Sequence, residues 1–162
     1  MTDAYAQWTS LDVRRPEDVP AATPLSWKAE REAEHAGRMA NLQLPDDFPH
    51  EVERGTASDA LAVLALRESI RQDIETGRGL RVRDAMEQGA TWAEVAGALD
   101  VEVEDARALL RTWASVQHTL HRQDVEAGRA RPFGLTAEQH AAVRGLCALG
   151  DHERAGGRTT QV

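Results

Sequence analysis

The sequence has little of several residue types, and each shortage excludes a class of structure. Cys147 is the single cysteine in 162 residues, so neither an internal disulfide nor a zinc site built from several cysteines can form. No run approaches the roughly 18–20 apolar residues that a transmembrane helix requires. The first residues, MTDAYAQW, lack the charged and apolar regions of a secretory signal peptide. These absences predict a soluble, cytoplasmic protein in a reducing environment.

Positive charge is also scarce. The chain has 19 Lys and Arg against 27 Asp and Glu, a formal net charge of −8. This balance excludes a globally basic nucleic-acid coat and a cationic membrane peptide, so any anion binding must come from a local patch. The sequence contains no Gly-rich phosphate loop, no G-x-S-x-G motif and no paired carboxylates in an aromatic setting. We therefore expect no enzymatic activity and no cofactor.

Proline divides the chain near residue 57. Five of the six prolines precede that point, and prolines at this spacing do not allow long helices or central strands. Residues 1–57 carry a net charge of −5. We predict an extended, Pro-rich acidic arm with one helix at 26–40. The rings of Trp8 and Trp27 are expected to anchor this arm, either to its own domain or to a protein partner.

Residues 58–149 show helical periodicity, without sustained period-two alternation. Apolar residues recur at spacings of three and four from Val63 to Ile74, which predicts a helix that ends at Gly77. Further helices are expected over 80–88 and 92–99, from Val103 to about 120, and after Thr136. The prediction is an all-α fold, a small multi-helix domain followed by a flexible polar tail at 150–162.

The clearest pattern is G-A-T-W-A-E-V-A-G-A-L-D-V-E-V-E-D-A-R-A-L-L-R, residues 89–111. Thr91 and Glu94 form a capping box that opens a helix of about eight residues. Ala96 is small enough for a second helix to cross there, and Asp100 stands at a turn position that must tolerate positive φ. This pattern resembles the bacterial helix-turn-helix motif of repressors and of sigma-factor promoter-reading domains, although the family usually has glycine at the turn. An ordinary helical corner would give similar spacing.

The resemblance implies a tri-helical core at about 58–120, with a long third helix and an additional C-terminal helix. We expect Ala106 and Leu109 to close this core against the preceding helix. In the family, the second helix of the motif enters the major groove with its N-terminal outward side chains. Arg107 and Arg111, one turn apart, would then contact a guanine edge or a phosphate. The expected DNA-contacting residues are Glu102, Val103, Glu104, Arg107, Ala108, Arg111, Arg81, Arg83 and Arg122.

Local charge gives arguments for and against DNA binding: nearby arginines favour it, and acidic residues oppose it. Residues 106–134 have a net charge of +3, and arginines there and ahead of the motif could contact backbone phosphates or form solvated helix faces. The acidic residues at the start of the second helix suit its macrodipole but repel phosphates. The sequence thus predicts a sequence-specific regulator that binds double-stranded DNA. The alternative is a non-catalytic interaction module that binds a protein through the acidic arm.

Other candidate sites are weaker. The long third helix and the final helix would either brace the domain or pair two chains into a homodimer. His118 and His121 have a spacing that can hold a metal, yet no carboxylate or cysteine accompanies them in a known motif. We expect ordinary helix histidines and no metal site. Cys147 lies on an apolar helix face, where an inert buried thiol is expected.

Overall fold

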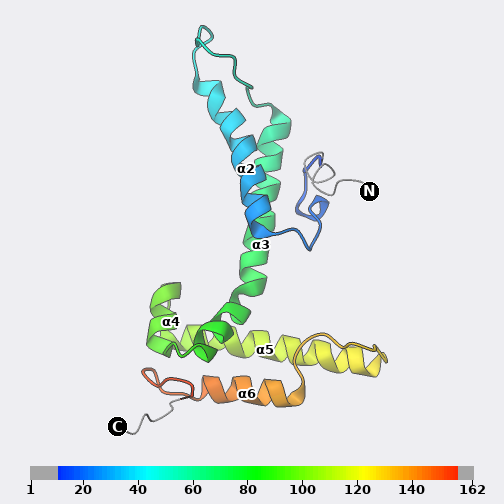
Figure 1. Ribbon diagram of the computed structural model, residues 1–162, viewed down its shortest axis with the longest axis vertical. Helices are drawn as coiled ribbons and strands as arrows, with labels where there is room; N and C mark the ends of the chain where they lie inside the picture. The colour runs from blue at the N-terminus through cyan, green and yellow to red at the C-terminus, as the bar shows by residue number, and fades with distance from the viewer. Residues whose placement is uncertain (1–10, 157–162) are drawn as a thin grey trace. The chain divides into compact units, whose positions relative to one another are not determined.

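All regular structure in the described part of the chain is helical. The computed structural model describes residues 11–156, and no strand occurs among them. The elements in chain order are η1 (Pro16–Asp18), α2 (Leu25–Ala40), η2 (Asn41–Gln43), α3 (Ala57–Glu87), α4 (Trp92–Leu99), α5 (Val103–Glu126) and α6 (Ala137–Cys147), as Figure 1 shows. The all-α prediction is confirmed for these residues. Trp8 and the end of the predicted tail lie outside the described residues.

None of the helices within residues 11–156 combines the length and the apolarity that a membrane crossing would need. The chain forms two compact units, and the division between them lies inside α3, between Glu75 and Thr76. The break in proline content at residue 57 therefore does not coincide with the structural division. The reason is that the first half of α3 shares its core with α2 and with the segment that precedes α2.

The first unit has a small apolar core between α2 and α3. Trp27 is 8% exposed and Leu66 is fully buried, and they pack with Val13, Val19 and Ala65. Of the two roles considered for Trp27, the ring thus fills the first: it anchors the Pro-rich arm to its own unit. Fully burying one large apolar side chain such as these contributes about 1.5–3 kcal/mol.

Lys28, the one lysine in the sequence, lies buried beside this core. Its Nζ donates to Ser69 Oγ at 2.9 Å and to Asp73 Oδ2 at 2.6 Å. A buried ammonium is strongly unfavourable unless it is paired and hydrogen-bonded. The two acceptors on α3 meet that requirement and fix α2 against α3.

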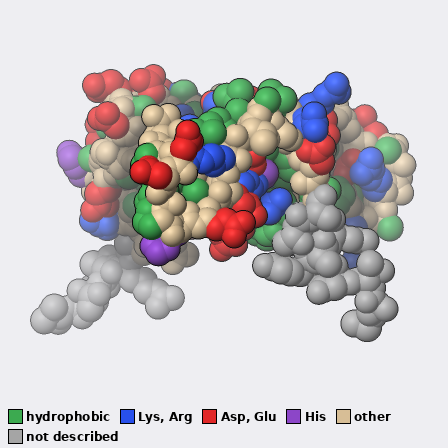
Figure 2. All heavy atoms as spheres, turned by 90° about the horizontal axis from the view of Figure 1, so that it is seen from above, with side chains coloured by type: hydrophobic (Ala, Val, Ile, Leu, Met, Phe, Trp, Pro, Cys, Tyr) green, Lys and Arg blue, Asp and Glu red, His purple; other side chains and the backbone are tan. Residues whose placement is uncertain are grey.

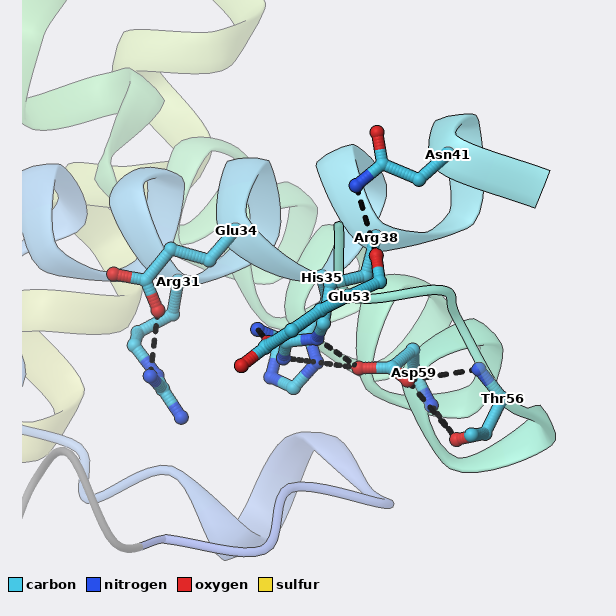
Figure 3. Close-up of polar contacts among 8 residues, drawn as sticks. All are labelled: Arg31, Glu34, His35, Arg38, Asn41, Glu53, Thr56 and Asp59. Carbon is cyan, nitrogen blue, oxygen red and sulfur yellow. Dashed lines mark hydrogen bonds and ion pairs between the residues drawn. The ribbon is translucent and has the colours of Figure 1, made fainter. Parts of the chain in front are cut away.

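A second polar network joins the end of α2 to the start of α3 (Figure 3). Asp59 Oδ1 lies 2.8 Å from His35 Nδ1 and accepts from Arg38 Nε at 2.7 Å. Asp59 Oδ2 accepts from both the backbone N and the Oγ1 of Thr56 at 2.9 Å, which caps the first turn of α3. The hydrogen bonds from His35 and Arg38 hold the pKa of the Asp59 carboxyl well below its usual range.

α3 is one continuous helix of 31 residues, where two helices, ending at Gly77 and beginning at residue 80, were predicted. That prediction is wrong because neither Gly77 nor Gly79 ends the helix, and Gly79 serves packing. Gly79 is buried, and a Cβ at this position would collide with the side chain of Trp113. Gly77 has open space around it. The helix ends just before Gly89, which has a φ of +92°, as expected for a glycine after a helix.

The second unit is built around α5, which packs against both α4 and α6. In Figure 1, α6 runs back alongside α5. Ala106 and Leu110 of α5 are fully buried. Leu109, predicted for the core, is only half-buried because the neighbouring Leu110 takes the inward position. The core contains Val82, Met86, Trp92, Val95, Ala96, Ala106, Leu110, Ala114, Leu135 and Val143.

Candidate functional site: the corner between α4 and α5

The corner formed by residues 91–111, here called the α4–α5 corner, begins with a well-formed helix cap. Thr91 Oγ1 accepts from Glu94 N at 3.2 Å, and Glu94 Oε2 accepts from Thr91 N at 2.8 Å. The predicted capping box is therefore present. The hydrogen bond from the Thr91 backbone, with a further contribution from Arg154, lowers the pKa of Glu94 to about 2. The cap fixes where α4 starts.

The turn depends on a left-handed residue. Asp100 has φ 53° and ψ 49°, and it is the one non-glycine residue of the described chain with a positive φ. Val101 N donates to Ala96 O at 3.1 Å, a bond typical of helix ends that carry a left-handed residue. Ala96 is 5% exposed. The conformation expected for Asp100 is thus observed, and it ends α4 so that α5 leaves in a new direction.

Arg107 is held by internal partners and does not project freely from α5. Its side chain is 16% exposed. Nη2 donates to Leu149 O at 2.8 Å and to Asp151 Oδ1 at 2.7 Å. The guanidinium carbon lies 5.5 Å from the ring centroid of Trp92, within the range of a cation–π interaction. The residue expected to contact a base therefore links α5 to α4 and to the end of the chain.

The C-terminal segment (residues 146–154) packs against the start of α4. Trp92 Nε1 donates to Leu146 O at 3.0 Å, and Ala93 N donates to Asp151 O at 2.9 Å. Arg154 Nη2 pairs with Glu94 Oε1 at 2.9 Å. Residues 150–154 are part of the predicted flexible tail, but they are hydrogen-bonded to the corner. Their partners in the corner are more than 40 residues away in sequence, so local pattern gives no signal for these contacts.

The first turns of α5 present an exposed outer surface. Glu102, Glu104, Asp105 and Ala108 are exposed, whereas Val103 is half-buried against the core. Arg111 is half exposed and forms an ion pair with Glu104. The hydrogen bond between them lowers the pKa of Glu104 and raises that of Arg111.

The three remaining predicted arginines lie in different settings. Arg81 is 79% exposed and pairs with Asp84 at 3.0 Å. Arg83 is largely covered, and its guanidinium lies 5.4 Å from the ring centroid of Trp113. Arg122 is 67% exposed, in the second half of α5.

Acidic and basic side chains are interspersed over the face seen in Figure 2. Exposed ion pairs of this kind contribute about 0–1 kcal/mol each, so their arginines can exchange partners easily.

The histidines and the cysteine make structural contacts. His118 Nδ1 lies 3.1 Å from Leu135 O, and His121 Nδ1 lies 3.2 Å from Phe133 O. The rings of His118 and His140 stack with centroids 4.7 Å apart. Residues 11–156 hold no group of three or more potential ligands placed to bind a metal. Cys147 is half-buried, and burial raises the pKa of its thiol, which disfavours the reactive thiolate.

The α4–α5 corner is therefore a two-helix element whose first cap, turn and C-terminal support are all defined by specific contacts. Its accessible part is the outer surface of the first turns of α5, with Arg111 at the edge. In comparisons with known proteins, no family model, no curated protein and no solved structure matches this chain.

Proposed function

We propose that the protein binds duplex DNA through the α4–α5 corner, as a small transcription regulator of the helix-turn-helix type. The observation that carries this proposal is the left-handed Asp100 between an eight-residue helix and a longer one, with Ala96 buried beside the turn. A helix-turn-helix needs such a turn because its second helix must stand at a steep angle to the first. The second helix can then lie in the major groove, which is about 12 Å wide.

Arg111 is the side chain best suited to contact DNA in this arrangement. Its ion pair with Glu104 is solvent-exposed, and such pairs contribute about 0–1 kcal/mol. A bidentate contact of arginine with a guanine edge is worth about 1–3 kcal/mol. For Arg111, replacing the ion pair with Glu104 by a contact with DNA is therefore favourable. Ala108, one turn earlier, is small and exposed, so it allows the helix backbone to approach the bases.

Arg107 has a different role in this proposal. It does not contact a base, because its guanidinium donates to Leu149 O and Asp151 Oδ1 and lies over Trp92. It positions α5 relative to α4. Arg81 and Arg122, both largely exposed, remain candidates for contacts with backbone phosphates, which orient a protein on DNA without selecting sequence.

The acidic start of α5 favours a second candidate, a non-catalytic module that docks a basic protein partner. Glu102, Glu104 and Asp105 are all exposed and would repel phosphates at the point where α5 enters the groove. The internal binding of Arg107 removes one positive charge that was expected to compensate them. Trp27 is buried in the first unit, so in this candidate the partner docks on α5 and not on that ring.

Fluorescence polarisation with labelled duplex fragments tests the proposal. We expect micromolar or tighter binding at about 50 mM salt that weakens steeply toward about 200 mM. Arg111→Ala should weaken binding about tenfold, the loss of one good base contact. Arg71→Ala is the matched control, because Arg71 is 53% exposed and also ion-paired, in the first unit, and it should bind like the wild type. Absence of binding at low salt would overturn the proposal.

Neutralising the acidic start of α5 separates the two candidates. The double variant Glu102→Gln and Glu104→Gln removes two charges that repel phosphates, so it should bind duplex DNA more tightly than the wild type. In the docking candidate the same carboxylates recognise the partner, and the variant should gain no DNA affinity.

A further inference from the structure

We propose that a second copy of the chain docks antiparallel on the outer face of α5 and holds two α4–α5 corners one turn of B-DNA apart. The spacing part of this inference rests on the proposed DNA-binding function. The pairing of the two chains rests on the surface of α5 alone.

The second half of α5 exposes apolar side chains in a groove. Val116 is 59% exposed and Leu120 is 37% exposed. The groove is lined by Ser115, Val116, Thr119, Leu120 and Gln123. Ala114 faces the core, and Val116 follows it by two residues. At 3.6 residues per turn their side chains point about 160° apart, so Val116 faces away from the core.

An uncharged seam extends from this groove toward the start of the helix. Leu109, Thr112, Val116, Thr119 and Gln123 follow one another at alternating spacings of three and four, the repeat of a coiled-coil seam. Leu109 is half-buried and the other four are exposed. The first charges in this register are Asp105 at one end and Glu126 at the other. Two such seams can therefore meet without placing like charges against each other at the centre.

The two ends of α5 differ in charge, which selects the antiparallel orientation. Glu102, Glu104 and Asp105 lie at its start. Its end is followed by Arg129, which pairs with the buried Asp124 at 3.2 Å, and by Arg131. Asp105 and Arg131 have no ion pair within residues 11–156. In a parallel pair the acidic starts would repel each other. In an antiparallel pair each acidic start meets the segment of the second copy that carries the unpaired Arg131, and the opposed helix dipoles add to the attraction.

A definite register follows. When Val116 lies against Thr119 of the second copy, Leu109 lies opposite Glu126 of that copy, and Asp105 lies beyond the end of its α5, beside the turn that carries Arg129 and Arg131. At a rise of 1.5 Å per residue, the centres of the two segments 103–109 are then about 34 Å apart along the helices. Half-sites read by helix-turn-helix dimers are separated by about 34–36 Å. The pairing also neutralises part of the acidic start of α5, which removes some of the repulsion between the corner and phosphates.

Sedimentation velocity of the full chain over a concentration series tests the pairing without DNA. We expect a reversible monomer–dimer equilibrium that is weak, in roughly the micromolar range, because one helical seam buries less than a standard interface. Val116→Glu should weaken the dimer at least tenfold. Val125→Glu is the matched control, because Val125 is 53% exposed on the same helix but lies off the seam. This variant should dimerise as strongly as the wild type.

Charge reversal tests the orientation. Asp105→Arg alone and Arg131→Glu alone should each weaken the dimer, and the two substitutions in one chain should restore it. Circular dichroism of each variant confirms that its helix content is unchanged. A chain that stays monomeric at all concentrations, a dimer insensitive to Val116→Glu, or the absence of restoration would each overturn the inference.

DNA binding provides a separate readout of the spacing. Duplexes with two half-sites one helical turn apart should bind more tightly than duplexes in which five base pairs are added between the half-sites. A dimer that binds no DNA would leave the pairing intact and refute the proposed function. DNA binding by a protein that stays monomeric would support the proposed function and refute the pairing.

Discussion

The guanidinium of Arg107 lies over the ring of Trp92, 5.5 Å from its centroid. Trp92 is the first residue of α4 and is fully buried. Because Arg107 also donates to Leu149 O and Asp151 Oδ1, one side chain connects α4, α5 and the C-terminal segment. The stability of the corner should therefore depend on Arg107 more than on any exposed arginine of α5.

Replacing Arg107 by alanine should lower the free energy of unfolding by about 1–3 kcal/mol. The change removes hydrogen bonds from a charged donor and leaves Leu149 O without its partner. Urea unfolding followed by tryptophan fluorescence measures the loss. Arg122→Ala, on the exposed part of the same helix, should change stability by less than about 0.5 kcal/mol. Equal effects of the two substitutions would contradict the role assigned to Arg107.

The turn at Asp100 predicts an ordered series of variants. Glycine adopts positive φ without strain, whereas alanine in the left-handed region costs about 1–2 kcal/mol. Asp100→Gly should raise the melting temperature and Asp100→Ala should lower it, with the wild type between them. Thermal unfolding followed by circular dichroism gives this order. An alanine variant as stable as the wild type would show that the left-handed turn does not hold in solution.

Two glycines of α3 should respond oppositely to the same change. A Cβ at Gly79 would collide with Trp113, so Gly79→Ala should destabilise by about 1–3 kcal/mol through overpacking. Gly77 has open space, and Gly77→Ala should stabilise by about 0.5–1 kcal/mol because alanine is the better helix former. Chemical denaturation of both variants checks the pair. A Gly79→Ala variant more stable than the wild type would contradict the close contact between Gly79 and Trp113.

Asp59 makes the stability of the first unit depend on pH. Its folded pKa is depressed below the ordinary value of 3.8 by hydrogen bonds from His35 and Arg38. The carboxylate therefore stabilises the fold above that value, and this contribution is lost as the pH falls through the folded pKa.

Urea unfolding of the wild type and of Asp59→Asn at pH 7 and at about pH 3 measures this contribution. The variant should be less stable by about 1–3 kcal/mol at pH 7, because charged acceptors of several hydrogen bonds are expensive to replace. The difference should shrink at the lower pH. Asp46→Asn is the control, since Asp46 is fully exposed and its contact with Arg54, at 3.9 Å, is loose. Its stability relative to the wild type should not depend on pH in this way.

Local features of the fold were predictable, and contacts distant in sequence were not. The capping box of Thr91 and Glu94 and the left-handed Asp100 follow from residue types a few positions apart. The single helix through Gly77 and Gly79 could not be predicted, because the reason for Gly79 is Trp113 on another helix. The partners of Arg107 lie 42 and 44 residues away, so its spacing from Arg111 predicted a shared exposed face that the packing does not provide.

The candidate surface was predicted in part. The sequence located the corner and its exposed acidic residues, since helix starts favour carboxylates for reasons independent of tertiary structure. The exposure of Leu120 cannot be predicted from the sequence, because its spacing on the helix suits a buried apolar stripe as well as an exposed one. Which side of a long amphipathic helix remains open depends on the number of elements packed around it, and α6 covers only one side of α5.

The burial of Lys28 has a practical consequence for the study of this molecule. With a single lysine in the chain, held between α2 and α3 by Ser69 and Asp73, an amine-directed acylating reagent can modify that ammonium group only after the two helices have separated. The extent of acylation at this one position, read by peptide mass spectrometry, therefore reports how often the first unit opens, without any mutation or added probe.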